Sequence, residues 1–204
     1  ASALAHCWSK PDAQLILTSI GGLSTVPRTG GTATAFVVEN EPGLPRGNSL
    51  SARWSPTGRI AFSRQCYDIR LTDGYMQQCI VVKDWPDGPA QLLTEGYRDS
   101  TPAWSPDGGY IMFERVIGAS ITKMVMPAAG GEPWVVDANL HIVGSVDWGR
   151  DAAGQNWLAY GPTGRSVYKL ALNPDGTTQA GAVPVDFGDS GWTMSGKNPR
   201  WSPD

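Results

Sequence analysis

The sequence predicts an all-β protein of the β-propeller type. A Trp followed by a tight turn and a short apolar strand recurs along the 204 residues. Gly and Pro are spread evenly along the chain, and no stretch has the periodicity of a long amphipathic helix. The repeated Trp residues follow one another at intervals of 46, 50, 44 and 53 residues, and they are Trp8, Trp54, Trp104, Trp148 and Trp201. A period of roughly 48 residues is the scale of a propeller blade.

The first strand of each repeat ends at the Trp, and a turn follows it, most clearly in the words WSPTG and WSPDG. Pro presets φ for the first turn position, Asp accepts a hydrogen bond from the nearby backbone, and Gly adopts the positive φ that ends the turn. This turn chemistry is a sufficient explanation for Asp107 and Asp204. The sequence has no D-x-D-x-D-G calcium loop, and we predict no metal site and no cofactor.

Three more strands follow the turn. The second alternates along residues 15–18, 60–63, 110–113 and 157–160. The third covers 79–82, 121–126 and 166–170, and Gly-rich turns lie at 29–32, 85–89, 128–132 and 173–177. The fourth returns along 35–38, 91–94, 133–136 and 182–185. Four short strands joined by tight turns predict a four-stranded antiparallel meander.

One such sheet cannot bury both of its faces, so we expect the meanders to stack as blades in a single propeller domain over residues 1–204. The predicted blades cover about 3–43, 50–96, 100–140 and 144–188, and residues 197–204 supply the first strand of a fifth. We therefore expect a fragment of a larger propeller, whose remaining blades or other subunits cover the open faces. The alternative is a four-bladed ring that the last strand closes.

The stretch TPAWSPDGGYIMFER, followed by ITKMVMPAAGGEPWVV, resembles the repeat of TolB-like β-propellers. The residues that carry the resemblance are Pro102, Trp104, Ser105, Pro106, Asp107, Gly108, Ile111, Phe113, Met126, Gly130 and Gly131. Residues 52–94 match the same pattern well, and 5–40 and 147–186 match it in outline. The resemblance implies a rigid propeller that presents its loops to another protein.

The composition limits the classes of partner. With 16 Lys and Arg against 19 Asp and Glu, the formal net charge is −3. A weak negative charge argues against nucleic acid or an anionic membrane as the main partner. No apolar run approaches the roughly 18–20 residues of a membrane span, so membrane insertion is not expected.

Cysteine spacing suggests a cross-strand pair. Cys66 and Cys79 flank a hairpin whose turn we expect at residues 72–73, and this would place the two residues opposite each other. Cross-strand cysteines can form a disulfide, and the alternative is two buried free thiols. We predict the disulfide. It would place the protein in an oxidising compartment, the periplasm or the extracellular space, and Ala3-Leu4-Ala5 fits a signal-peptidase recognition pattern.

The loops that join one blade to the next are predicted to gather at one mouth of the ring, and we expect a binding site there. The candidate binding residues are Arg53, Arg98, Asp99, His141, Asp147, Trp192 and Arg200. The alternative for each is a solvated loop residue.

Three functions follow from these observations. The leading hypothesis is a non-catalytic protein-interaction or assembly module, because the sequence shows no catalytic constellation. The first alternative is the propeller domain of a larger hydrolase, because similar propellers accompany the hydrolase domain of prolyl-oligopeptidase-like peptidases. The G-x-S-x-G elbow of that domain is absent from this sequence. The second alternative is a carbohydrate-binding propeller that uses Trp85, Trp134 or Trp192, which lie outside the repeated first-strand position.

Overall fold

The structure is a computed structural model that describes residues 6–8, 14–19, 22–27, 29–138, 142, 144–161 and 167–186. The chain forms two compact units, Ala1–Pro102 and Ala103–Asp204. The predicted first strand of a fifth blade, residues 197–204, lies outside the described residues. Within the described ranges no helix is long and apolar enough to cross a membrane.

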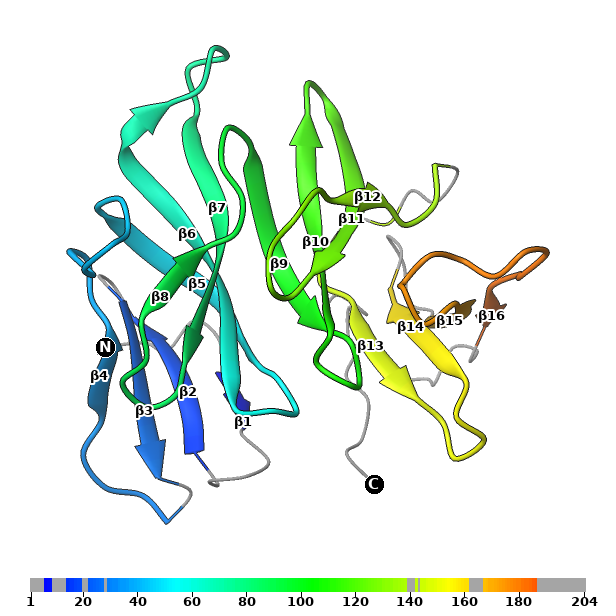
Figure 1. The fold of residues 1–204 in the computed structure, drawn as a ribbon, viewed down its shortest axis with the longest axis horizontal. Coiled ribbons are helices and arrows are strands. Elements are labelled where there is room, and N and C mark those ends of the chain that lie inside the picture. Colours follow the sequence, from blue (N-terminus) through cyan, green and yellow to red (C-terminus); the bar gives the residue numbers. More distant parts are fainter. Residues whose placement is uncertain are drawn as a thin grey trace. The chain divides into compact units, whose positions relative to one another are not determined.

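Unit 1 contains two four-stranded meanders (Figure 1). The first has the order β1 (His6–Trp8), β2 (Gln14–Ser19), β3 (Gly22–Pro27) and β4 (Thr34–Val37). The second has the order β5 (Gly47–Trp54), β6 (Arg59–Arg70), β7 (Met76–Asp84) and β8 (Ala90–Leu92). Neighbouring strands within each meander are antiparallel, as the sequence predicts.

The third and fourth meanders follow the same plan. β9 (Arg98–Trp104), which crosses the boundary between the two units, precedes β10 (Tyr110–Ile117), β11 (Ser120–Pro127) and β12 (Trp134–Val135). The last meander is β13 (Asp147–Arg150), β14 (Asn156–Tyr160), β15 (Tyr168–Leu172) and β16 (Val185–Asp186). The fourth strand of each is short, and β6 and β7 extend well beyond the residues that their apolar alternation predicts.

The turn after Trp104 is held by Ser105 as well as by the residues that the sequence pattern singles out. Ser105 Oγ accepts a hydrogen bond from Tyr110 N at 2.8 Å and donates one to Asp107 Oδ1 at 2.6 Å. Asp107 Oδ1 also accepts from Gly109 N, and Gly108 adopts φ 76°. The hydrogen bond from Ser105, followed by the one from Gly109, lowers the pKa of Asp107. The predicted turn role of Asp107 is therefore confirmed.

Each unit has its own apolar core. In unit 1 the core includes Phe36, Trp54, Phe62 and Val81, and all four are buried. In unit 2 it joins residues of the third and fourth meanders, such as Met112, Val125, Trp148 and Leu158. The repeated Trp54, Trp104 and Trp148 are thus packing residues.

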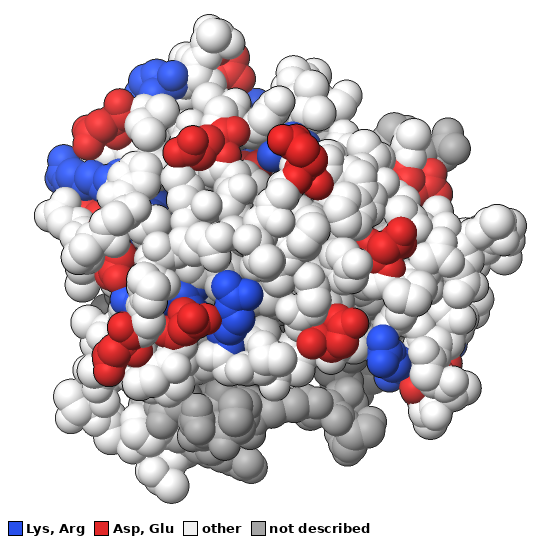
Figure 2. Space-filling view, viewed as in Figure 1, with Lys and Arg blue, Asp and Glu red and all other residues white. Residues whose placement is uncertain are grey.

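Charged side chains are sparse on the surface. Figure 2 shows acidic and basic residues interspersed on the face that it draws, between large uncharged areas. A surface of this kind agrees with the small net charge of −3 and does not form one field of a single sign.

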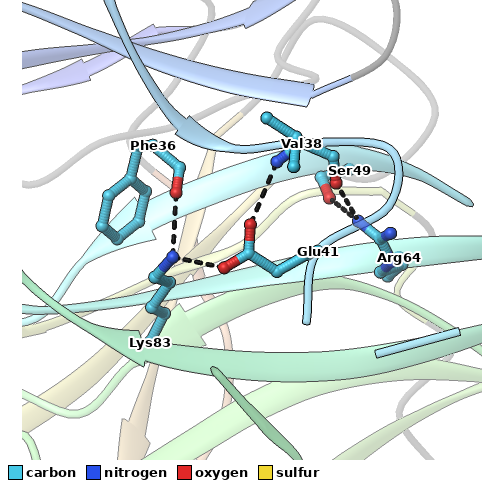
Figure 3. Close-up of polar contacts among 6 residues, drawn as sticks. All are labelled: Phe36, Val38, Glu41, Ser49, Arg64 and Lys83. Atoms are coloured by element: carbon cyan, nitrogen blue, oxygen red, sulfur yellow. Dashed lines mark hydrogen bonds and ion pairs between the residues drawn. The ribbon is translucent and has the colours of Figure 1, made fainter. Parts of the chain in front are cut away.

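A buried network of charged groups fixes the connection between β4 and β5 (Figure 3). Lys83 Nζ pairs with Glu41 Oε1 and donates to Phe36 O at 3.0 Å, and Glu41 Oε2 accepts from Val38 N at 3.2 Å.

The fully buried Arg64 holds the same connection. It donates to Pro45 O at 2.7 Å and to Val38 O at 3.1 Å. The same guanidinium donates to Ser49 Oγ at 3.0 Å and also to Glu39 O. Because each buried charge has a partner, the desolvation cost is offset and the path of the loop is fixed.

Unit 2 contains a similar buried ion pair, between Lys123 and Glu114. Lys123 Nζ lies 3.0 Å from Glu114 Oε1 and donates to Gly144 O at 2.5 Å. Gly144 N in turn donates to Glu114 Oε1 at 2.6 Å. Burial lowers the pKa of Lys123, although the Glu114 carboxylate beside it acts in the opposite direction. The β4–β5 and β12–β13 connections are therefore each held by a buried Lys–Glu pair.

The predicted disulfide between Cys66 and Cys79 is not formed. Both residues are buried free thiols whose Sγ atoms lie 3.5 Å apart. They are not directly opposite each other, because Cys79 pairs with Arg64 and the register shifts after Gln65. The thiol contact and burial raise the pKa of Cys79. Cys66 and Cys79 therefore give no indication of an oxidising compartment.

Candidate functional site

The hairpin between β6 and β7 ends in a tight, well-bonded turn. Leu71 N donates to Tyr75 O at 2.9 Å, and Gly74 N donates to Leu71 O at 2.9 Å. Asp73 Oδ1 accepts from Tyr75 N at 3.1 Å, and Gly74 adopts φ 82°. This residue pattern, Asp followed by Gly, forms the turn locally and holds the backbone of Tyr75 in place at the tip.

The segment that leads into β9 lies beside this hairpin. Gln78 N donates to Tyr97 O at 3.0 Å, and Gln78 is the parallel bridge partner of Arg98. Gly96 N donates to Gln77 Oε1 at 2.9 Å. These contacts bring the interblade connection before β9 to the same end of the sheet as the β6–β7 turn.

Arg98 and Tyr75 meet at this end. The Arg98 guanidinium carbon lies 4.2 Å from the centre of the Tyr75 ring. Arg98 Nη2 also lies 3.7 Å from Asp73 Oδ2. A cation over an aromatic ring and beside a carboxylate has a defined orientation before any ligand binds.

A hollow of about 240 Å³ lies between these side chains. It is lined by Gln65, Arg70, Gly74, Tyr75, Met76, Gln78 and Arg98, which we call the Tyr75–Arg98 surface. Tyr75 is 58% exposed, and Tyr97, the residue before Arg98, is 42% exposed. The lining offers guanidinium and amide donors beside an aromatic ring, and none of its side chains is a Ser, Cys, His or carboxylate. These groups can bind a ligand by hydrogen bonding and by stacking.

Of the other predicted site residues, two lie in unit 1. Arg53, in β5, is half-buried and donates from Nη1 to Ala52 O at 2.9 Å. Asp99 is fully buried in β9, although it follows the half-buried Arg98 directly, because successive side chains of a strand point to opposite faces. Asp147 begins β13 in unit 2, opposite Ala159. His141, Trp192 and Arg200 lie outside the described residues.

Sequence reasoning selected Arg98 but missed its neighbours. Tyr75 and Arg70 belong to the extended part of the β6–β7 hairpin, where apolar alternation had already ended. The sequence feature that could have indicated this site is the turn sequence TDGYM, which places an aromatic residue at the tip of a hairpin. The same residues form the turn of the expected disulfide hairpin. Within the described ranges, no three His, Cys, Asp or Glu side chains are grouped to hold a metal ion.

By sequence, no family model and no curated protein matches the chain. By structure it is similar to several β-propellers. A putative TolB from Agrobacterium tumefaciens gives a TM-score of 0.64 at 19% identity, covering 91% of this chain and 61% of that one. The calcium-binding protein regucalcin from A. tumefaciens gives 0.55 at 18% identity, covering 87% and 58%. A prolyl endopeptidase gives 0.52 at 10% identity, covering 87% and 34%.

These similarities confirm the predicted all-β propeller fold. The chain spans about three fifths of the length of the TolB and regucalcin structures, so it corresponds to part of such a propeller. The matched proteins include a calcium-binding protein and an endopeptidase as well as TolB. The shared feature is therefore the fold.

Proposed function

We propose that this protein is a non-catalytic interaction module and that it binds another protein through the Tyr75–Arg98 surface. The observation that carries the proposal is Tyr75, an aromatic side chain left 58% exposed at a hairpin tip with Arg98 stacked on it. Tyr and Arg are the residue types over-represented among the energetic centres of protein interfaces.

The geometry around Tyr75 favours association because little order has to be gained on binding. The turn is closed by backbone hydrogen bonds, and the Arg98 side chain is already held by the Tyr75 ring and by Asp73. Ordering a free, flexible side chain at an interface costs about 0.5–1.5 kcal/mol, and a preorganised pair avoids part of that cost. The adjacent hollow provides a place for a side chain of the partner.

The resemblance of the repeats to TolB-like propellers supports the same function. So does the mixed surface charge, which suits a protein partner better than a polyanion. The expected partner presents a side chain that fits the hollow and a hydrogen-bond acceptor for Arg98. We also propose that further blades or subunits complete the propeller, because the chain covers 61% of the putative TolB.

Photo-crosslinking followed by affinity measurement tests this function. A photoreactive phenylalanine analogue replaces Tyr75, and the matched control carries it at Val183, which is 72% exposed on another part of the chain. After irradiation in the source cells, the crosslinked protein is identified by mass spectrometry and purified. Calorimetry then compares its affinity for the wild type, Tyr75→Ala and Arg98→Ala.

We expect crosslinks from position 75 in excess of those from 183, and an affinity at least about tenfold lower for Tyr75→Ala, as for a hot-spot residue. The stability of Tyr75→Ala should stay within about 0.5 kcal/mol of the wild type, because the residue is exposed. Equal crosslinking at both positions, or an unchanged affinity in both alanine variants, would refute the assignment.

A further inference from the structure

We propose a second binding site, for a neutral polyhydroxylated ligand such as a sugar, at the end of β7 opposite the Tyr75–Arg98 surface. Its basis is a cavity of about 370 Å³ in unit 1, whose lining includes an indole ring, three threonines, an ammonium group and a carboxylate. These residues are Thr25, Thr32, Thr34, Lys83, Trp85 and Asp87. The volume falls within the range of roughly 300–1,000 Å³ that small-molecule sites occupy.

The topology gathers these groups from two blades. Thr25 in β3 and Thr34 in β4 are direct cross-strand partners, so their side chains share one face of the first sheet. Phe36 also lines the cavity, and Lys83 Nζ lies 4.9 Å from the centre of its ring. The turn after β7 then adds Trp85 and Asp87.

Trp85 supplies a fixed aromatic surface. Its ring is half-buried, and its centre lies 5.2 Å from that of Phe36 and 5.6 Å from that of Trp54. Two aromatic neighbours hold the indole in one orientation. The C–H groups of a sugar ring form an apolar face with slightly positive hydrogens, which complements the negative face of an aromatic ring.

The polar groups of the cavity suit hydroxyl groups. Each threonine hydroxyl can donate and accept a hydrogen bond, and the side chains of Thr32 and Thr34 are exposed. The Lys83 ammonium has three N–H donors. Its hydrogen bonds to the described residues go to Glu41 and Phe36 O, which leaves one donor for a ligand.

The charge balance argues for a neutral ligand. Glu41 pairs with Lys83, so the ammonium brings no net positive charge to the cavity, and the exposed Asp87 adds a negative one. An anion would meet the Asp87 carboxylate without an unpaired cation to balance it. Hydroxyl groups can instead accept from Lys83 and donate to Asp87.

The site is separate from the Tyr75–Arg98 surface. β7 runs from Met76, which lines that surface, to Asp84, which lies between the cavity residues Lys83 and Trp85 in the sequence. Nine residues in a strand span roughly 26 Å. Substitutions at one end can therefore be tested without direct contact with the other.

Saturation-transfer NMR and calorimetry test this site with glucose, galactose, mannose, N-acetylglucosamine, maltose and cellobiose, and with glucuronate as the anionic comparison. We expect at least one neutral sugar to bind with a dissociation constant on the order of 1 mM, the scale for a ligand of about a dozen non-hydrogen atoms. Glucuronate should bind at least about threefold more weakly than glucose.

Two substitutions assign the binding to this cavity. Thr34→Val keeps the shape of an exposed side chain and removes its hydroxyl, and Asp87→Asn removes the carboxylate charge. Thr34→Val removes one hydrogen bond and Asp87→Asn removes the charge that strengthens another, so each should weaken sugar binding about five- to tenfold. Tyr75→Ala should bind the sugar as the wild type does, so that failure of the interaction surface and failure of this site are told apart. Absence of binding by every neutral sugar, or affinities unaffected by both substitutions, would overturn the proposal.

Discussion

Glu41 shows how much one buried side chain can determine in this protein. It comes from a loop, yet its carboxylate is almost fully enclosed and bonds both to Lys83 and to the backbone of Val38. No local sequence pattern marks it, because its partner follows 42 residues later in another blade. Sequence reasoning found the apolar residues that repeat with the blades and missed the charged residues that do not.

Glu41→Gln is predicted to destabilise the protein by about 3 kcal/mol, because it leaves the buried Lys83 ammonium without its counter-charge. Urea denaturation of the two proteins measures the difference in the free energy of unfolding. The control is Asp84→Asn, which breaks the more exposed ion pair with Arg59 and should cost less than about 1 kcal/mol. Equal losses of unfolding free energy in the two variants would show that the buried Glu41–Lys83 pair does not stabilise the protein more than an exposed pair does.

At the scale of the element, β5 and β9 share a local distortion. Ser51 and Thr101 adopt φ values of 53° and 51°, and each lies three residues before the Trp that ends its strand. In β5 the register to β6 shifts between Leu50 and Arg53, as expected for a bulge. Thr101 also has a buried hydroxyl without a partner among the described residues. The left-handed conformation is unfavourable for a β-branched residue such as Thr101. The packing and pairing of the strands in the blade, and not the local sequence, therefore impose it.

Thr101→Gly is therefore predicted to stabilise the protein by about 0.5–1 kcal/mol, because it removes both the strained φ and the unpaired hydroxyl. Thermal and urea unfolding measure this gain. Ser100→Gly, one position earlier, should instead cost about 0.5–1 kcal/mol, since glycine weakens an ordinary strand position. A loss of stability in Thr101→Gly as large as that in Ser100→Gly would contradict the strain argument.

The predicted strands were found wherever turn chemistry and alternation agree, as in 110–113 and 157–160, which lie within β10 and β14. The prediction failed in the β6–β7 hairpin. There the strands continue through polar residues as far as Arg70, and the register shift separates Cys66 from the position opposite Cys79. A register is set by the whole ladder and its bulges, so counting residues back from an assumed turn cannot give it. The same extension brings Tyr75 to Arg98, which is why the candidate site was only partly predicted.

At the scale of the whole molecule, charge is the property that the sequence describes best. A net charge of −3 with interspersed signs gives no strong field for steering a partner. We therefore predict that the affinity for the protein partner falls less than about threefold between 0.05 and 0.3 M salt. Calorimetry of the purified complex at the two concentrations measures this. A decrease of ten- to a hundredfold would mean that binding is driven by charge and that the Tyr75–Arg98 surface is not its centre.

The buried network around Arg64 also bears on how the chain can be engineered. The Arg64 guanidinium donates hydrogen bonds to the carbonyls of Val38, Glu39 and Pro45, so the backbone is fixed at these three positions. An epitope tag or a fluorescent label inserted between β4 and β5 would detach those carbonyls from a cation that has no access to water. In the turn between β11 and β12, Gly131 and Glu132 are exposed, and a reporter sequence is better inserted between them.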